Sequence, residues 1–360
     1  MLLNIGLIIG GFVVLVFGAD WLVKGASRLA LSLGMTPLVV GLTVVAFGTS
    51  APELAVSVAS AWSGQADLAV GNVVGSNIAN VLLILGVSAV VAPLVVNQQL
   101  VRLDVPIMLG ASVLFYVLAL DGRISLVDGA ILSASIVLYV VFLIRQSRRE
   151  KNSAVLTEYE GAVESGGNLL TDIAWMVVGL VALVAGAQLL VEGAVSLARA
   201  FGVSELMIGL TVLAIGTSLP ELATSVVAAL RGERDIAVGN VVGSNIFNLL
   251  SVLGFTGLVS LGQLPVAPAA LALDIPVMLG VALLCMPIFR AGFTVTRANG
   301  MFFLLCYAAY LSWLIVSNSG TPPAWMSTSL LSGLIPLAVL ITVVSFVRSI
   351  SEEKGGPSDH

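Results

Sequence analysis

The chain contains the stretch GLTVVAFGTSAPELAVSVAS at residues 41–60 and repeats it as GLTVLAIGTSLPELATSVVA at residues 209–228. The two copies share fourteen of twenty positions at an offset of 168 residues. A second segment shows the same offset: residues 67–80 read DLAVGNVVGSNIAN, and residues 235–248 read DIAVGNVVGSNIFN. The chain is therefore an internal duplication, and each half carries one copy of both motifs.

The composition indicates that most of this sequence lies in a lipid bilayer. Of 360 residues, 58% are hydrophobic and only 10% are charged, whereas a soluble domain carries about 25% charged residues. A globule of this size cannot hide that much apolar surface from water. We therefore predict an all-α polytopic membrane protein.

Breaks in hydropathy divide the sequence into eleven segments long enough to cross a bilayer, which takes about 20 apolar residues. The predicted spans are 4–27, 36–62, 68–94, 104–120, 126–145, 171–199, 204–230, 236–262, 274–290, 299–317 and 327–347. The predicted units are a first five-helix repeat at 1–145, a cytoplasmic linker at 146–170, a second five-helix repeat at 171–317, and an extra transmembrane helix with a tail at 318–360.

Five spans separate equivalent points of the duplication, and because five is odd the second repeat enters the membrane upside down. Inverted repeats are typical of secondary transporters, whose substrate site lies near the bilayer midplane between the repeats. With the N-terminus outside and the C-terminus in the cytoplasm, only Arg123 and Arg199 of the 15 Lys and Arg residues lie outside. The positive-inside rule favours this orientation, and we predict a multi-pass protein of the cell inner membrane.

Each copy of the first motif places a glutamate in the middle of a predicted span, Glu53 in the second and Glu221 in the seventh. Such intramembrane acids usually mark an ion pathway, since an ionised carboxylate at this depth costs several kcal/mol. Pro52 and Pro220 precede them, and proline removes an amide donor and breaks a helix. We predict a broken helix in each repeat, with backbone carbonyl oxygens at membrane depth that suit Na⁺ or Ca²⁺.

Hydroxyl side chains accompany both glutamates. Each glutamate follows a threonine by four residues, which puts the two on one helix face, and it follows a serine by three. These residues are Thr49 and Ser50 before Glu53, and Thr217 and Ser218 before Glu221. Hydrogen bonding back to their own helix is the alternative role for these hydroxyls.

The second motif aligns polar residues along one helix face, because positions i, i+4 and i+8 coincide on a helix. The stripe consists of Asn72, Ser76 and Asn80 in the first repeat and of Asn240, Ser244 and Asn248 in the second. Ligand roles fall to Asn80 and Asn248, whereas Asn72 and Asn240 brace helices, as do the two motif prolines. Asn77 and Asn245 point away from this stripe.

Two further acids, Asp104 and Asp274, also repeat and lie at span ends. Each is followed by a proline two residues later. Because that pattern suits the start of a helix, we predict that both aspartates are helix N-caps.

The paired GTS-x-PE and GN-x-x-GSN-I-x-N segments resemble the two alpha-repeats of the cation/calcium exchanger superfamily, and they are most similar to prokaryotic sodium/calcium exchangers. The resemblance covers residues 1 to about 317 and implies a ten-helix fold of two inverted five-helix repeats. It implies metal ligands at Glu53, Thr49, Ser50, Ser76, Asn80 and the carbonyl of Ala46 in the first repeat, and at Glu221, Thr217, Ser218, Ser244, Asn248 and the carbonyl of Ala214 in the second.

The resemblance also implies the transported ions. We expect an antiporter that exchanges Na⁺ for Ca²⁺ by alternating access, three to one and electrogenically, with the long first and sixth spans as moving parts. Several relatives carry an aspartate where Asn248 stands, and asparagine in both repeats argues against K⁺ coupling. A proton/calcium exchanger using the same glutamates stays an alternative, as do a K⁺-dependent exchanger and a passive cation channel.

An enzyme is not expected. The only histidine is His360, and no nucleophile–base pair or phosphate-binding loop is evident. Apart from the lipid bilayer and the ions Ca²⁺ and Na⁺, we expect no cofactor, nucleic acid or protein partner.

Overall fold

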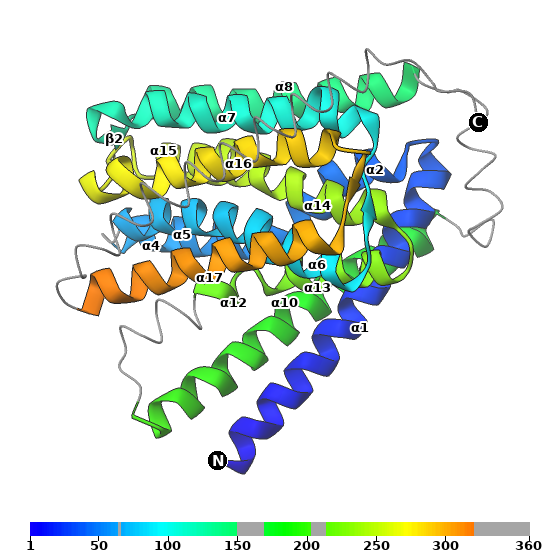
Figure 1. The fold of residues 1–360 in the computed structure, drawn as a ribbon, viewed down its shortest axis with the longest axis horizontal. Coiled ribbons are helices and arrows are strands. Elements are labelled where there is room, and N and C mark those ends of the chain that lie inside the picture. The colour runs from blue at the N-terminus through cyan, green and yellow to red at the C-terminus, as the bar shows by residue number, and fades with distance from the viewer. Residues whose placement is uncertain (64–65, 150–168, 203–213, 320–360) are drawn as a thin grey trace.

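The computed structural model describes residues 1–63, 66–149, 169–202 and 214–319, which form a bundle of long apolar helices (Figure 1). Among these residues, eight helices are long and apolar enough to cross a membrane, and a bent pair of shorter helices forms a further span. The prediction of an all-α polytopic fold is confirmed. The predicted eleventh span lies outside the described residues, as does most of the predicted linker.

The first repeat consists of one long helix, one bent span and three further spans. Its elements are α1 (Leu2–Leu33), α2 (Pro37–Val40), η1 (Gly41–Val45), α3 (Ala46–Thr49), α4 (Ala51–Trp62), α5 (Ala66–Ala79), η2 (Asn80–Leu85), α6 (Gly86–Val91), β1 (Leu94–Val95), η3 (Leu100–Asp104), α7 (Val105–Leu118), η4 (Ala119–Asp121), β2 (Arg123–Ile124) and α8 (Leu126–Arg149). The segments η1, η2 and η3 are π-helical turns that continue directly into the next helix.

The described part of the second repeat follows a similar order of elements. They are α10 (Leu169–Ala200), α12 (Ala214–Gly216), α13 (Leu219–Leu230), α14 (Arg234–Phe247), η6 (Asn248–Val252), α15 (Leu253–Val259), β3 (Leu264–Pro265), η7 (Ala270–Asp274), α16 (Ile275–Arg290), β4 (Thr294–Val295) and α17 (Arg297–Ser319). Residues 203–213, the first part of the predicted seventh span, lie outside the described residues.

The predicted helix breaks beside the glutamates are confirmed. The second span bends by 41° between α3 and α4, where Ser50 leaves the helical conformation with φ −80° and ψ 3°. Ser218, with φ −91° and ψ 8°, separates α12 from α13. Each proline then stands in the first turn of the new helix, where its missing N–H has no partner to lose. Each glutamate therefore lies in the first turn of a helix.

Two short β ladders, which the sequence analysis did not predict, join the repeats at their ends. Strand β1 pairs with β4 in antiparallel register, with Leu94 opposite Val295. Strand β2 pairs with β3, with Ile124 opposite Leu264. Each ladder connects a loop of one repeat to a loop of the other, and the predicted topology puts both loops of a pair on the same side of the membrane.

The prediction that Asp104 and Asp274 are helix N-caps is wrong. Each aspartate is the last residue of a π-helical turn that runs into the following helix, so its backbone is already helical and its side chain makes no capping bond. Asp104 instead accepts a hydrogen bond from the Tyr139 hydroxyl at 3.1 Å, and Asp274 accepts one from Tyr310 at 2.9 Å. These bonds tie the fourth span of each repeat to its fifth.

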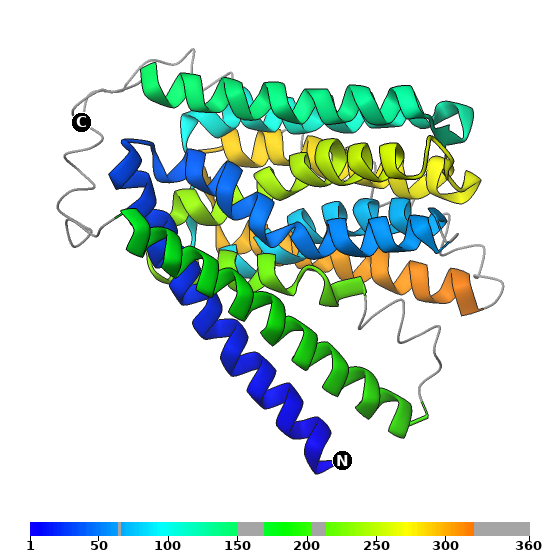
Figure 2. The same ribbon diagram turned by 180° about the vertical axis from the view of Figure 1, so that it is seen from behind.

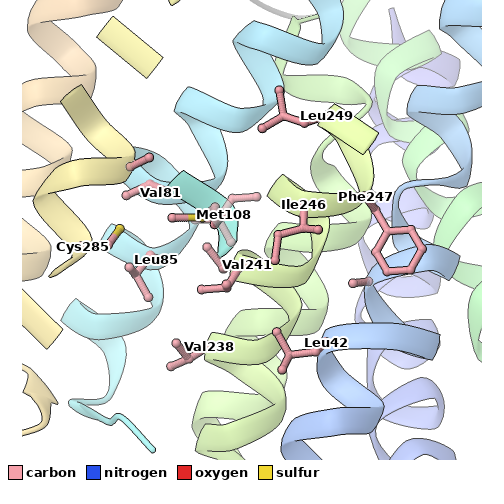
Figure 3. Packing of buried hydrophobic residues seen from close by; sticks show 14 of the residues in the cluster. Leu42, Val81, Leu85, Met108, Val238, Val241, Ile246, Phe247, Leu249 and Cys285 are labelled. Atoms are coloured by element: carbon pink, nitrogen blue, oxygen red, sulfur yellow. The ribbon is translucent and has the colours of Figure 1, made fainter. Parts of the chain in front are cut away.

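Helix α14 lies at the centre of the bundle, since every residue from Ile236 to Phe247 is buried. Figure 3 shows apolar side chains of both repeats packed around it. The labelled members are Leu42, Val81, Leu85, Met108, Val238, Val241, Ile246, Phe247, Leu249 and Cys285. The second motif thus lies on a helix that the other repeat surrounds.

Helices α1 and α10 lie side by side and cross the rest of the bundle obliquely (Figures 1 and 2). Their contact is a seam of glycines at seven-residue spacing that the duplication repeats. The seam consists of Gly11, Gly18 and Gly25 on α1 and of Gly179, Gly186 and Gly193 on α10. A Cβ on Gly18 would stand 2.6 Å from the Leu183 amide nitrogen and 2.9 Å from the Gly179 carbonyl oxygen. The two backbones therefore touch, as small residues allow in membrane helix pairs.

An ion-pair group ties α1 to the turn after α13. The Asp20 carboxylate pairs with Lys24 Nζ at 2.9 Å and with the Arg231 guanidinium. Lys24 and Arg231 thus lie at the same end of the bundle, as the predicted alternation of spans requires.

The seam makes a direct prediction for stability. Gly18→Ala should lower the midpoint of thermal unfolding in detergent, because overpacking against backbone that cannot turn away costs about 1–3 kcal/mol. Gly110→Ala on α7 is the matched control, since a Cβ there meets no atom within 4 Å. Equal midpoints for the two variants would show that α1 and α10 separate without cost.

Candidate cation site

Glu53 and Glu221 face the opposite repeat, and both are completely buried. Glu53 Oε1 accepts a hydrogen bond from the Ser218 hydroxyl at 3.2 Å. Glu221 Oε1 accepts one from Ser50 at 3.3 Å. The two bonds are exchanged between the repeats, so the broken helices meet at the pair of carboxylates.

The second oxygen of each carboxylate makes no hydrogen bond. Glu53 Oε2 and Glu221 Oε2 are buried and have no hydrogen-bond partner. Neither glutamate forms an ion pair with a Lys or Arg side chain of the described residues. Because a buried charge is costly unless it is compensated, these two oxygens are suited to a cation.

The asparagines that begin each polar stripe hold the glutamate helices. Asn72 Nδ2 donates to the Glu53 carbonyl oxygen at 3.3 Å and to Ser57 Oγ at 3.1 Å. Asn240 Nδ2 repeats this with the Glu221 carbonyl at 3.3 Å. It also donates to Ser225 Oγ at 3.0 Å. This geometry supports a bracing role, which fixes the position of each carboxylate from behind.

The threonines connect these braces across the repeats. Thr49 Oγ1 donates to Asn240 Oδ1 at 3.0 Å, and Thr217 Oγ1 lies 3.5 Å from Asn72 Oδ1. Because the threonine hydrogen is used in this bond, the hydroxyl oxygen keeps lone pairs for another partner. The alternative of bonding only to their own helix does not describe these hydroxyls, although Thr49 also approaches the Ala46 carbonyl oxygen at 3.4 Å.

The last asparagine of each stripe also presents an unused oxygen. Asn80 is 1% exposed and Asn248 is 0% exposed, and the Oδ1 atom of each has no hydrogen-bond partner. Their Nδ2 atoms donate to asparagines of the opposite repeat, namely Asn245 and Asn77. Each asparagine begins a π-helical turn, η2 or η6, and such turns are frequent at functional sites.

The remaining candidates are less alike in the two repeats. Ser76 Oγ lies 3.3 Å from Ser218 Oγ, whose one hydrogen points to Glu53 at the shorter distance, whereas Ser244 Oγ is buried without a partner. The Ala46 carbonyl accepts the Ser50 amide at 3.0 Å and keeps a second lone pair. Ala214 is the first residue of α12. The ligand roles of all these residues stay predictions.

Sequence reasoning missed four residues that contact this site. Ser57 and Ser225 accept from the bracing asparagines, and Asn77 and Asn245 bond to the stripe of the other repeat. All four are polar residues repeated at the 168-residue offset. Their repetition at that offset could have marked them as candidates. The helical periodicity of one repeat, however, does not predict contacts with the other repeat.

The buried side-chain atoms of this site that lack a hydrogen-bond partner are all oxygens. Five buried oxygens without partners belong to the predicted ligand residues, namely Glu53 Oε2, Glu221 Oε2, Asn80 Oδ1, Asn248 Oδ1 and Ser244 Oγ, and a sixth in the two motifs is Thr224 Oγ1. Oxygen ligands of mixed charge suit Na⁺ and Ca²⁺ rather than softer metals. No group of three or more His, Cys, Asp or Glu side chains that would hold a metal occurs in the described part of the chain.

The chain is similar to known transport proteins along both repeats. It matches the family described as "Sodium/calcium exchanger protein" over residues 3–147 and 171–316. It is 41% identical over 292 residues to the inner membrane protein YrbG of Escherichia coli (strain K12), covering 79% of this chain and 89% of that protein. It is 34% identical over 342 residues to the sodium/calcium exchanger MaX1 of Methanosarcina acetivorans, covering 86% of this chain and 97% of that one.

A solved structure has the same fold. The sodium-calcium exchanger NCX_Mj superimposes with a TM-score of 0.73 at 28% identity, over 87% of this chain and 99% of that chain. The arrangement of the described helices is therefore shared with that protein.

The braces can be tested in one repeat against the other. Asn240→Leu should lower the thermal midpoint more than Asn72→Leu, because Asn240 is completely buried and the better bonded of the two. Each buried group left without a partner costs about 1–3 kcal/mol. Unfolding of both variants in detergent measures this, and an Asn240 variant as stable as wild type would show that the brace is dispensable.

Proposed function

Because the chain belongs to the sodium/calcium exchanger family, we propose that its cation/calcium antiport exchanges Na⁺ for Ca²⁺ at the site between the two repeats. Three Na⁺ ions move against one Ca²⁺ ion, so that each cycle transfers one net positive charge, and K⁺ takes no part. Members of this family are exchangers rather than enzymes.

The observation that carries the proposal is the pair of buried carboxylates with unused Oε2 atoms, one on Glu53 and one on Glu221. They supply about two negative charges, which one Ca²⁺ ion balances. Several Na⁺ ions balance the same charges when they are spread over the carboxylates and the neutral oxygens around them. The two ions therefore compete for one set of ligands, which is the requirement for exchange.

The neutral ligands are proposed from the two motifs. We assign them to Thr49, Ser50, Ser76, Asn80 and the Ala46 carbonyl, and to Thr217, Ser218, Ser244, Asn248 and the Ala214 carbonyl. Ca²⁺ takes six to eight oxygen ligands in flexible geometry. A set of this size, divided between two helix breaks, can supply them without rigid cage geometry.

Coupling follows from the cost of an empty site. With no ion bound, two ionised carboxylates would face each other in a low dielectric, and each uncompensated buried charge costs several kcal/mol. The unloaded protein then crosses between access states rarely, whereas the loaded protein crosses readily. Exchange is favoured over leak, as antiport requires.

The moving unit is proposed to be the α1–α10 pair. Its seam consists of glycines that let the two backbones touch, so the pair has the contacts of one body. The Asp20 ion-pair group provides a contact from this pair to α13 that can open and close at one end. We place that end in the cytoplasm, with the N-terminus outside, because the basic residues concentrate there under the predicted topology.

The coupling ion is tested with purified protein in liposomes loaded with Na⁺, K⁺ or a pH gradient, with radioactive Ca²⁺ outside. We expect Ca²⁺ uptake that requires internal Na⁺, is indifferent to K⁺, and accelerates under an inside-positive potential because net positive charge leaves. Uptake that follows the pH gradient without Na⁺ would identify a proton exchanger. Uptake without any gradient would identify a channel.

The two glutamates are tested in the same assay. Glu53→Gln and Glu221→Gln should each reduce Na⁺-driven Ca²⁺ uptake on the order of 100-fold or more, since removing one partner of a buried charge pair costs about 3–5 kcal/mol. Glu192→Gln is the control, because Glu192 is exposed on α10. Wild-type rates in either site variant would return that glutamate to a structural role.

A further inference from the structure

Four asparagines form a clasp between α5–η2 and α14–η6, and all of them are buried. Its hydrogen bonds run from Asn80 Nδ2 to Asn245 Oδ1 at 3.0 Å, from Asn248 Nδ2 to Asn77 Oδ1 at 3.1 Å, and from Asn77 Nδ2 to the Asn245 carbonyl oxygen at 3.2 Å. A fourth bond leaves the clasp, from Asn245 Nδ2 to Met108 Sδ at 3.5 Å. Each repeat therefore bonds to the ligand asparagine of the other.

An asparagine side chain can turn its oxygen or its nitrogen toward a neighbour, and the two orientations have nearly the same shape. They differ in charge, since the oxygen attracts a cation and the N–H₂ group repels it. A ligand asparagine is useful only if its environment selects the oxygen. For Asn80 and Asn248 that selection has to come from the partners of their Nδ2 atoms.

The clasp makes this selection through groups that only accept hydrogen bonds. A thioether sulfur cannot donate, so Met108 fixes the nitrogen of Asn245 and leaves Asn245 Oδ1 facing Asn80. A backbone carbonyl cannot donate either, so the Asn245 carbonyl fixes the nitrogen of Asn77 and leaves Asn77 Oδ1 facing Asn248. Each ligand asparagine must then direct its nitrogen to the clasp, and its Oδ1 is left without a protein partner.

We infer that Asn77 and Asn245 are positioning residues that orient Asn248 and Asn80 of the opposite repeat with their oxygen toward the transported cation. The inference rests on the proposed function, because it assigns a reason to an orientation that only a cation would use. Asn77 and Asn245 do not themselves contact the ion. They act by preventing the side-chain amides of Asn80 and Asn248 from turning Nδ2 toward the cation.

The test uses a substitution that makes orientation irrelevant. Asn245→Leu removes the acceptor for Asn80 Nδ2, so the amide can flip. The cation then loses one oxygen ligand, and the Ca²⁺ concentration for half-maximal uptake should rise by about tenfold, which corresponds to about 1.4 kcal/mol. Asn80→Asp presents an oxygen whichever way it turns. In the Asn80→Asp background the carboxylate faces Asn245 Oδ1 with no hydrogen between them, so adding Asn245→Leu should not raise the half-maximal concentration.

A merely structural role gives a different result, because Asn245→Leu would then have the same effect in both backgrounds. Asn77→Leu, with and without Asn248→Asp, repeats the test through the other repeat. Gln188→Leu, an exposed amide on α10, controls for loss of an amide in general. Folding is followed by the elution profile and thermal midpoint of each variant in detergent.

The outcomes separate the inference from the proposed function. A wild-type protein that neither exchanges Ca²⁺ nor gains thermal stability from it would overturn the proposed function. A wild type that exchanges, with an Asn245→Leu variant of unchanged half-maximal concentration, would overturn only the positioning role. Leu variants that fail to fold, and that Asn80→Asp and Asn248→Asp do not restore, would make the clasp structural and would also overturn it.

Discussion

Two buried carboxylates, with no Lys or Arg paired to them among the described residues, lie where the two repeats touch, and the surrounding structure holds them there. In Glu53 and Glu221, one carboxylate oxygen accepts a hydrogen bond from a serine of the other repeat, and the second oxygen has no partner. Such an arrangement is unfavourable in a low dielectric unless a cation enters it. The helix breaks reduce the cost, because each glutamate lies in the first turn of a helix, where free amide groups and the helix dipole stabilise negative charge.

The polar side chains around the glutamates have two different roles, and one of them depends on hydrogen bonds between the repeats. Asn72 and Asn240 bond to the backbone behind each carboxylate, so they fix position and leave the carboxylate oxygens alone. The serines reach across to the carboxylates themselves. Since the serine and threonine bonds and the asparagine bonds of the clasp join one repeat to the other, neither half can form the site alone, and the duplication is a requirement of the site.

The sequence was sufficient for the order of the described spans and for the two helix breaks. Hydropathy located those spans, the 168-residue offset predicted the inverted repeat, and Pro52 and Pro220 predicted the breaks. It failed for the starts of two helices and for contacts between elements. Asp104 and Asp274 resemble N-caps in sequence, but the π-helical turns before them start each helix earlier, and their true partners are tyrosines on the next span. The clasp was missed for the same reason, because its bonds cross between repeats.

The positions at which the repeats differ determine whether the inward-facing and outward-facing states have different free energies. If the two halves were identical, the two-fold axis in the membrane plane would convert the inward-facing state into the outward-facing one, and the two states would have equal free energy. A preference between them must come from positions that differ, and Asp20, Lys24 and Arg231 correspond to Gln188, Glu192 and Ser63. The residues at the symmetric positions therefore cannot form the same ion-pair group at the other end of the bundle. A partly exposed ion pair contributes about 0–1 kcal/mol, which shifts a two-state equilibrium by up to about fivefold. A shift of this size favours one of the two states, inward-facing or outward-facing, but leaves the other populated. A transporter requires this because it must visit both states.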